Sequence, residues 1–309
     1  MRRVATVVTL AAALAMAVIT ASTAPALAAG GAGHGSGPGG GSSYYLALGD
    51  SLSVGVQPNA AGVDEPTDQG YPDQLYDALQ SVQPGLRLVK LGCPGETTAT
   101  MISGGICGYP VGPGGTATGS QLSAATGFLR QYASQVSLVT IDIGANDLNP
   151  CIALAATDPG QVAPCVEQVT PAAVANLTTI MTGLRAAGGA HVRIIGMTYY
   201  DPELADWLTG SAGQAFARLS VDLVSGYNDY LASVYRKFGA SVAGVFGAFH
   251  TADFTDQATL PNVGTVPLNV ALICSWTWEC APPPQGPDEH ANAAGYAVIA
   301  RTFLAADSG

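Results

Sequence analysis

The sequence predicts a three-layer α/β/α sandwich around a parallel sheet of about five strands. Two observations predict it: short apolar runs alternate with longer segments of helical periodicity, and this alternation repeats along most of the chain. Strands separated by helices pair in parallel through right-handed crossovers, which place helices on both faces of the sheet. One main domain is expected, because a chain of 309 residues with 48% hydrophobic content can bury one large core.

Five short apolar runs are the expected strands. The first begins where foldable sequence starts, at Tyr44, with the residues "YYLAL", and each run contains residue types that favour strands. The expected strands are 44–48, 86–91, 138–143, 192–198 and 241–246.

The segments between these runs carry helical periodicity. In one of them apolar residues recur at helical spacing from Val174 to Leu184, so Pro171 is expected in the first turn and Gly188 at the end. The expected helices are 71–82, 120–133, 171–189, 213–239 and 292–303.

The first residues of the chain have the features of an export signal. Arg2 and Arg3 precede a continuous apolar stretch from Val4 to Ile19, and Ala26-Leu27-Ala28 forms a small-residue cleavage site. A transmembrane anchor is the alternative, but it needs about 20 apolar residues and stop-transfer flanks. The expected division is a signal peptide at 1–28, a Gly/Ser-rich flexible linker at 29–43 and a folded domain at 44–309, which predicts a secreted, extracellular protein.

The charge balance excludes two classes of partner. The formal net charge is −11, and removal of the signal peptide with Arg2 and Arg3 makes it more negative. Such a surface repels phosphate backbones and anionic lipid headgroups, so we expect no nucleic-acid partner and no stable membrane anchor. We expect a monomer.

All six cysteines lie after the expected cleavage site. An even number in an exported protein predicts three disulfides, although six cysteines allow 15 connectivities. The sequence has no C-x-x-C pair, so zinc binding is weakly supported and we expect no metal or other cofactor. Because sequential pairing closes three local loops, we expect the bonds Cys93–Cys107, Cys151–Cys165 and Cys274–Cys280.

Polar or glycine-rich stretches follow the first three expected strands. They read "GDSLS" at 49–53, "GCPGETT" at 92–98 and "GANDLN" at 144–149. In open parallel sheets the ligand crevice lies beyond the carboxyl ends of the strands. These three stretches are therefore expected to meet at one edge of the sheet.

The residues in these stretches suit acyl transfer. Ser51 offers a hydroxyl that could act as a nucleophile beside a base. The main-chain N–H groups of Ser51 and Gly95 and the side-chain amide of Asn146 could donate to an oxyanion. Each residue alone also fits an ordinary turn, but their occurrence after three successive strands favours a catalytic site.

The base must come from four histidines. His290, in "GPDEHANAAGY", precedes the last expected helix and can return to the sheet edge, so it is preferred. His250 directly follows the fifth expected strand and is the competitor. His34 in the linker and His191 at a strand entrance are poor candidates.

Four blocks carry a family resemblance. "GDSLS", "PGET" at 94–97, "GAND" at 144–147 and "DEHANAAGY" at 288–296 resemble, in order, the blocks of the SGNH or GDSL hydrolases, and most closely secreted actinobacterial lipases and esterases with three disulfides. The resemblance implies a flavodoxin-like sheet, Ser51 as nucleophile and His290 as base. It also implies Ser51 N–H, Gly95 and Asn146 as oxyanion donors, and no metal.

The last block departs from the family pattern. The family usually reads Asp-x-x-His-Pro, whereas here Pro287 stands at the Asp position and Ala291 at the Pro position. The group that orients His290 is therefore either Asp288 or a main-chain carbonyl in "CSWTWEC", residues 274–280.

These residues predict a secreted serine carboxylic ester hydrolase, an esterase or lipase. Ser51 would be acylated, and water activated by His290 would deacylate it. The substrate would be a small-molecule or lipid ester, of acyl length and alcohol that the sequence does not specify. One alternative keeps the site but acts as a polysaccharide or xylan acetyl esterase. Another is a catalytically silent binding module on the same scaffold.

Overall fold

The computed structural model describes residues 43–110 and 117–307. The expected signal peptide and nearly all of the expected linker lie outside the described residues. The centre of the fold is a five-stranded sheet in which every neighbouring pair is parallel, as the sequence predicts. Its order is β4 (Leu86–Lys90), β1 (Ser43–Gly49), β7 (Val136–Asp142), β8 (Arg193–Met197) and β9 (Ser241–Ala243).

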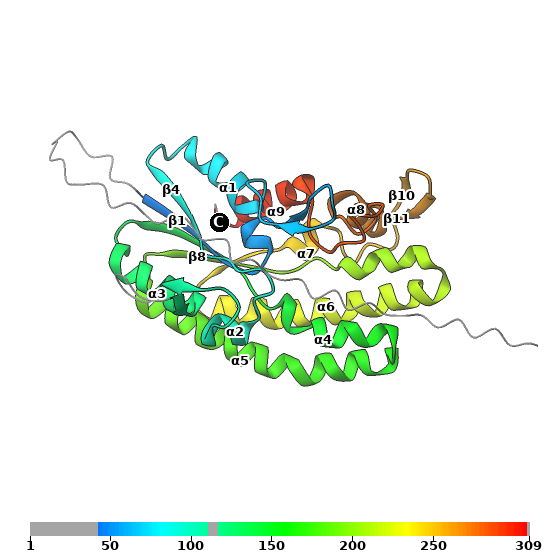
Figure 1. Ribbon diagram of the computed structural model, residues 1–309, viewed down its shortest axis with the longest axis horizontal. Coiled ribbons are helices and arrows are strands. Elements are labelled where there is room, and N and C mark those ends of the chain that lie inside the picture. The colour runs from blue at the N-terminus through cyan, green and yellow to red at the C-terminus, as the bar shows by residue number, and fades with distance from the viewer. Residues whose placement is uncertain (1–42, 111–116, 308–309) are drawn as a thin grey trace, which may run out of the picture. The chain divides into compact units, whose positions relative to one another are not determined.

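Helices cover both faces of this sheet (Figure 1). On one face α1 (Tyr71–Gln80) packs against α9 (Ala293–Asp307). On the other, α5 (Val162–Gly188) packs between α3 (Gln121–Tyr132) and α6 (Ser211–Lys237). The predicted three-layer α/β/α sandwich is confirmed. No helix in the described part of the chain is long and apolar enough to cross a membrane.

The other elements are short and lie in the connections. The α-helices are α2 (Thr98–Ser103), α4 (Asn149–Ile152), α7 (Val245–Ala248) and α8 (Leu268–Trp276). The 3-10 helices are η1 (Leu52–Val54), η2 (Ala145–Asp147), η3 (Ala153–Ala156), η4 (Pro159–Gln161) and η5 (Pro202–Thr209). Three antiparallel pairs join β2 (Gln57–Pro58) to β3 (Asp64–Glu65), β5 (Tyr109–Pro110) to β6 (Ala117–Gly119), and β10 (Gln257–Leu260) to β11 (Gly264–Pro267).

Burial on both faces explains why the strands are apolar runs rather than alternating patterns. The four consecutive residues 45–48 of β1 have no exposed surface. In a parallel sheet covered by helices, residues on either side of the strand must be apolar. The core thus extends through the sheet, and on one face the stacked rings of Tyr71 and Phe303 join α1 to α9.

Most of the expected ends differ from the observed ones by a few residues, and two of the differences have a clear physical cause. Helix α5 begins at Val162, so Pro171 lies inside the helix and not in its first turn. The buried side chains of Val162, Val166 and Thr170 continue the buried face before the proline, and their burial offsets the cost of the hydrogen bond that Pro171 cannot donate. The fifth strand is shorter than expected, because the chain turns into helix α7 two residues after Ala243.

The six cysteines pair in sequence order, as predicted. The bonds close local loops next to helices α2, α4 and α8 and leave no free cysteine in the described part of the chain. They are Cys93–Cys107, Cys151–Cys165 and Cys274–Cys280.

The strand order fixes the position of the ligand crevice. Strand β1 has β4, the next strand of this sheet in the sequence, on one side and β7 on the other. The chain therefore leaves β1 toward one edge of the sheet and leaves β7 toward the other edge. This is the topology that the flavodoxin-like resemblance implies, and ligands bind at its switch point, beyond the carboxyl ends of those two strands.

Candidate active site

The first loop of the site is a tight turn after β1. Gly49 has φ of +136°, and a Cβ at this position would lie 2.0 Å from the carbonyl oxygen of Asp142 on the neighbouring strand. Only glycine fits there. The turn ends the strand and leaves Ser51 half-buried at the start of η1, at the carboxyl edge of the sheet.

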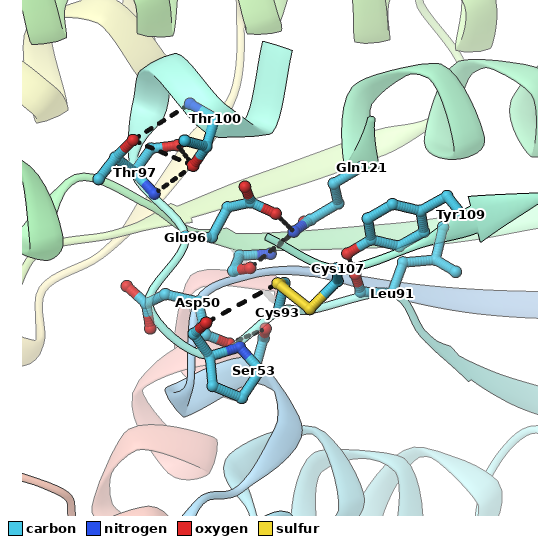
Figure 2. Close-up of a disulfide and its surroundings, with 12 residues drawn as sticks. Asp50, Ser53, Leu91, Cys93, Glu96, Thr97, Thr100, Cys107, Tyr109 and Gln121 are labelled. Atoms are coloured by element: carbon cyan, nitrogen blue, oxygen red, sulfur yellow. Dashed lines mark hydrogen bonds between the residues drawn. A yellow bond between two sulfur atoms is a disulfide. The ribbon is translucent and has the colours of Figure 1, made fainter. Parts of the chain in front are cut away.

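A glutamine from helix α3 holds this turn. The Gly49 N–H donates to Gln121 Oε1 at 2.7 Å, and Gln121 Nε2 donates to the Gly49 carbonyl at 2.8 Å. Gln121 Nε2 also donates to Glu96 Oε2 at 3.1 Å, and Figure 2 shows these two side chains pointing toward each other. Sequence reasoning missed Gln121, because nothing in its local pattern distinguishes it from a helical surface residue.

The second loop follows β4 and carries Gly95. The Cys93 N–H donates to the Gly49 carbonyl at 3.0 Å, and the Cys93–Cys107 disulfide fixes the same segment (Figure 2). Gly95 has φ of +77°, and the space where a Cβ would lie is open. Its glycine-favouring conformation and the open space beside it would let a ligand approach the main-chain N–H of Gly95. Gly95 does not line the cavity described below.

The third loop follows β7 and carries Asn146 in η2. Asn146 Nδ2 donates to the Glu96 carbonyl at 3.0 Å, and the carboxylate of Asp147 accepts from the N–H and hydroxyl of Thr98 at 2.8 and 2.6 Å. These bonds connect the second and third loops. An amide nitrogen carries two N–H donors, so Asn146 keeps one for a ligand.

The fourth segment is the loop before α9, which carries His290. Nδ1 of His290 donates to Asp288 Oδ1 at 3.0 Å, and the His290 main-chain N–H donates to the same oxygen at 2.9 Å. The sequence left two groups as candidates to orient the His290 ring, Asp288 and a main-chain carbonyl of residues 274–280. In the structure the ring contacts Asp288. Residues 274–280 hold the loop differently: the Trp278 N–H donates to the His290 carbonyl at 3.0 Å.

This pair is electrostatically coupled. Burial lowers the pKa of His290, but the hydrogen bond and charge of Asp288, with the charges of Glu289 and Asp64, outweigh it and raise the pKa above its usual value. Burial raises the pKa of Asp288, but the hydrogen bond and charge of His290 outweigh it and lower the pKa. With Nδ1 donating to a carboxylate, Nε2 is the nitrogen free to accept a proton.

Ser51, Asn146 and His290 line one cavity of about 100 Å³. The competitor His250 does not line it. The structure shows no hydrogen bond between the side chains of Ser51 and His290, which is common where no substrate is bound. Apolar walls come from several elements, contributed by Leu52, Leu148, Ile152, Pro202 and Val224.

Acidic groups line the same cavity. Glu203 lies at the start of η5, where burial, followed by the charges of Asp201 and Asp206, raises its pKa to about 8. Burial also raises the pKa of Asp201 to about 7. At neutral pH the cavity wall therefore carries less negative charge than its composition indicates.

One group of side chains in the described residues could hold a metal ion. Asp64, Asp288 and His290 bring one possible ligand atom each within 4.8 Å of one another. Asp64 comes from β3 and was not a sequence candidate. Its carboxyl faces Asp288, and its pKa is raised first by burial and then by the charge of Asp288.

Comparison with known proteins places this arrangement in a family. The model of the GDSL-like lipase/acylhydrolase family matches residues 47–298, which include all four segments. The chain belongs to this family. As a GDSL hydrolase it is a carboxylic ester hydrolase.

Solved structures share the fold of this GDSL hydrolase at low sequence identity. An extracellular lipase from Streptomyces rimosus is 16% identical, with a TM-score of 0.53 over 86% of this chain and 100% of the other. A phospholipase A1 from Streptomyces albidoflavus is 17% identical, with a TM-score of 0.52 over 86% and 100%. A lipase from a goat rumen metagenome is 15% identical, with a TM-score of 0.52 over 86% and 97%. A search of curated proteins finds no match.

Proposed function

We propose that this GDSL hydrolase cleaves esters through an acyl-enzyme on Ser51, with His290 as general base and Asp288 as the group that orients it. One observation carries the proposal: Ser51, Asn146 and His290 come from three separate segments yet line one cavity, and Nδ1 of His290 is fixed by Asp288. A hydroxyl is a weak nucleophile and requires such a base.

The residues support a two-step reaction. Nε2 of His290 takes the proton of Ser51 as Oγ attacks the ester carbonyl, and Asp288 stabilises the imidazolium that forms. The N–H groups of Ser51, Gly95 and Asn146 donate to the oxyanion. The imidazolium returns its proton to the leaving alcohol, and a water activated by the same ring then releases the acid.

The cavity suits an apolar acyl group. Most of its exposed wall area is apolar, and Ser51 is among the residues that line it. The substrate would be a small-molecule or lipid ester. A series of p-nitrophenyl esters of increasing acyl length tests this: turnover of several lengths supports an esterase or lipase, whereas turnover of the acetyl ester alone would support a polysaccharide deacetylase instead. Absence of turnover on every ester would contradict the proposal.

We also propose that the protein is exported as a monomer after cleavage behind Ala28. The apolar stretch after Arg2 and Arg3 and the three disulfides support export. N-terminal sequencing of protein from the culture medium should begin at Ala29, and light scattering should give the mass of one chain. A protein that still begins at Met1 would contradict the cleavage, and the mass of a dimer would contradict the monomer.

A further inference from the structure

Two acidic side chains next to Ser51 take no part in the proposed reaction. Asp50, in the turn after β1, is 2% exposed, and Asp142, at the end of β7, has no exposed surface. Strands β1 and β7 are neighbours, and just after the end of β1 the Asp50 N–H donates to the Asp142 carbonyl at 3.0 Å. The Asp142 carboxyl lies against the turn that carries Asp50, because a Cβ at Gly49 would lie 2.6 Å from Asp142 Cγ. The charges of the two carboxyl groups act on each other.

The partners of this pair are neutral donors. Asp50 accepts from the Leu52 N–H and from the Tyr199 hydroxyl, both at 3.0 Å. Asp142 Oδ1 accepts from the Tyr71 hydroxyl at 2.5 Å. Asp142 Oδ2 is fully buried and has no hydrogen-bond partner among the described residues. None of the ion pairs in the described part of the chain includes either acid.

Two carboxylates cannot both be ionised in such a site. Each charge would be buried without a cation, and the two charges would repel each other. A proton held between them removes one charge and gives Asp142 Oδ2 an O–H to donate. Asp50 can accept this hydrogen bond, because each carboxylate oxygen has two lone pairs. The bonds from Leu52 and Tyr199 use only one lone pair of each Asp50 oxygen.

We propose that Asp142 is a positioning residue of this hydrolase: it stays protonated at neutral pH and donates to the Asp50 carboxylate, and this hydrogen bond fixes the turn that presents Ser51. The link to the turn is direct, because the same carboxylate accepts from Leu52, the residue after Ser51. The expected effect of Asp142 on catalysis rests on the proposed role of Ser51. The protonation of Asp142 does not depend on that role.

The pair should lose its proton at a higher pH than an ordinary carboxylic acid does. Burial, followed by the charge of Asp50, raises the pKa of Asp142 well above its usual value. Loss of the proton would place two negative charges together and disturb the turn, so activity should fall. The other ionisable groups that act on the pair are Tyr45, Tyr71, Tyr199, Tyr200, Tyr235, Tyr296, Glu96, Glu289 and His290.

Infrared spectroscopy tests the proton directly. The difference spectrum of the wild type minus Asp142→Asn, at about pH 7, should contain the carbonyl band of a protonated carboxylic acid. Asp201→Asn is the matched control: Asp201 is also fully buried, with a pKa of about 7, and the band that depends on Asp142 should remain in its spectrum. Absence of the Asp142-dependent band at neutral pH would overturn the proposal.

Kinetics test the positioning role. Asp142→Asn replaces the O–H donor by an amide N–H, so kcat at neutral pH should stay within about threefold of the wild type, and the alkaline loss of activity should disappear. Asp142→Leu has no donor and should lower kcat by about tenfold or more at unchanged KM. Identical alkaline profiles for the wild type and Asp142→Asn would overturn the role. If Ser51 is not the nucleophile, Ser51→Ala stays active while the infrared band remains.

Discussion

At the scale of single residues, His290 and Asp288 form the pair on which proton transfer depends. Asp288→Asn should lower kcat by about two orders of magnitude or more, because an amide can favour the wrong imidazole tautomer and cannot stabilise the imidazolium. A loss of tenfold or less, with folding intact, would indicate that another acceptor serves the ring. Steady-state kinetics with the acetyl ester decides between these results.

The same variant should move the acid side of the pH profile. A general base must be unprotonated, and Asp288 raises the pKa of His290, so kcat/KM of the wild type should rise with pH through a value above the usual 6.5 of histidine. Without the charge of Asp288, His290 should lose its proton at lower pH, and the residual activity of Asp288→Asn should begin at lower pH. An unchanged or upward shift would contradict this coupling.

Asn146 provides a second test at this scale. Asn146→Ala should lower kcat by about 10²- to 10³-fold with little change in KM, because the lost donor acts on the transition state. Asn176→Ala is the control, since Asn176 supports the same loops through Thr98 but does not line the cavity. Equal losses in both variants would show that Asn146 matters only for loop structure.

The sequence could predict the site residues that stand in recognisable motifs, but not the side chains that hold those residues in place. Ser51, Asn146 and His290 stand in recognisable motifs, whereas Gln121, Asp64 and the partners of Asp50 act through contacts between distant segments. Asp288 stayed open because a carboxylate two residues from His290 and a carbonyl of a neighbouring loop fit the sequence equally well. Only the folded arrangement distinguishes them.

At the scale of elements, the turn after β1 depends on glycine. Gly49→Ala should destabilise the fold by about 3 kcal/mol or more, because its Cβ would collide with the main chain of β7 and its φ is positive. Gly127→Ala in helix α3 is the control: its Cβ meets nothing within 4 Å, so it should stabilise by about 0.5–1 kcal/mol. Urea unfolding measures both, and a neutral Gly49→Ala would contradict the close approach.

The disulfides should contribute according to loop length. Removal of Cys93–Cys107, with a separation of 14 residues, should cost about 3 kcal/mol, and removal of Cys274–Cys280, with a separation of 6, about 2 kcal/mol. The unfolding free energies of the two double alanine variants measure this. Full stability after both removals would contradict the expected restriction of the unfolded chain.

Sequence patterns located the elements better than their ends. The five strands were readable because a parallel sheet buried on both faces requires apolar runs. The start of α5 was not, because a proline usually marks a first turn, and the buried face that continues through Pro171 is apparent only in the packed structure.

At the scale of the whole molecule, buried acids should make stability depend on pH. Burial and neighbouring acids raise the pKa of Glu203 from 4.5 to about 8, so between these values the folded state binds more protons than the unfolded state and stability falls as pH rises. Glu203→Gln should reduce this fall in Tm, whereas Glu167→Gln, at an exposed position, should not. If the Tm of the wild type, Glu203→Gln and Glu167→Gln depended equally on pH, the raised pKa of Glu203 would be contradicted.

The most direct test of the proposed catalytic role of Ser51 is active-site labelling with a fluorophosphonate, followed by peptide mapping. One label per chain should appear on Ser51, in parallel with loss of esterase activity. Ser53→Ala, a change in the same motif at a serine that donates to the Asp50 carbonyl, should still be labelled at Ser51. A label on another residue, or full activity in Ser51→Ala, would contradict Ser51 as the nucleophile.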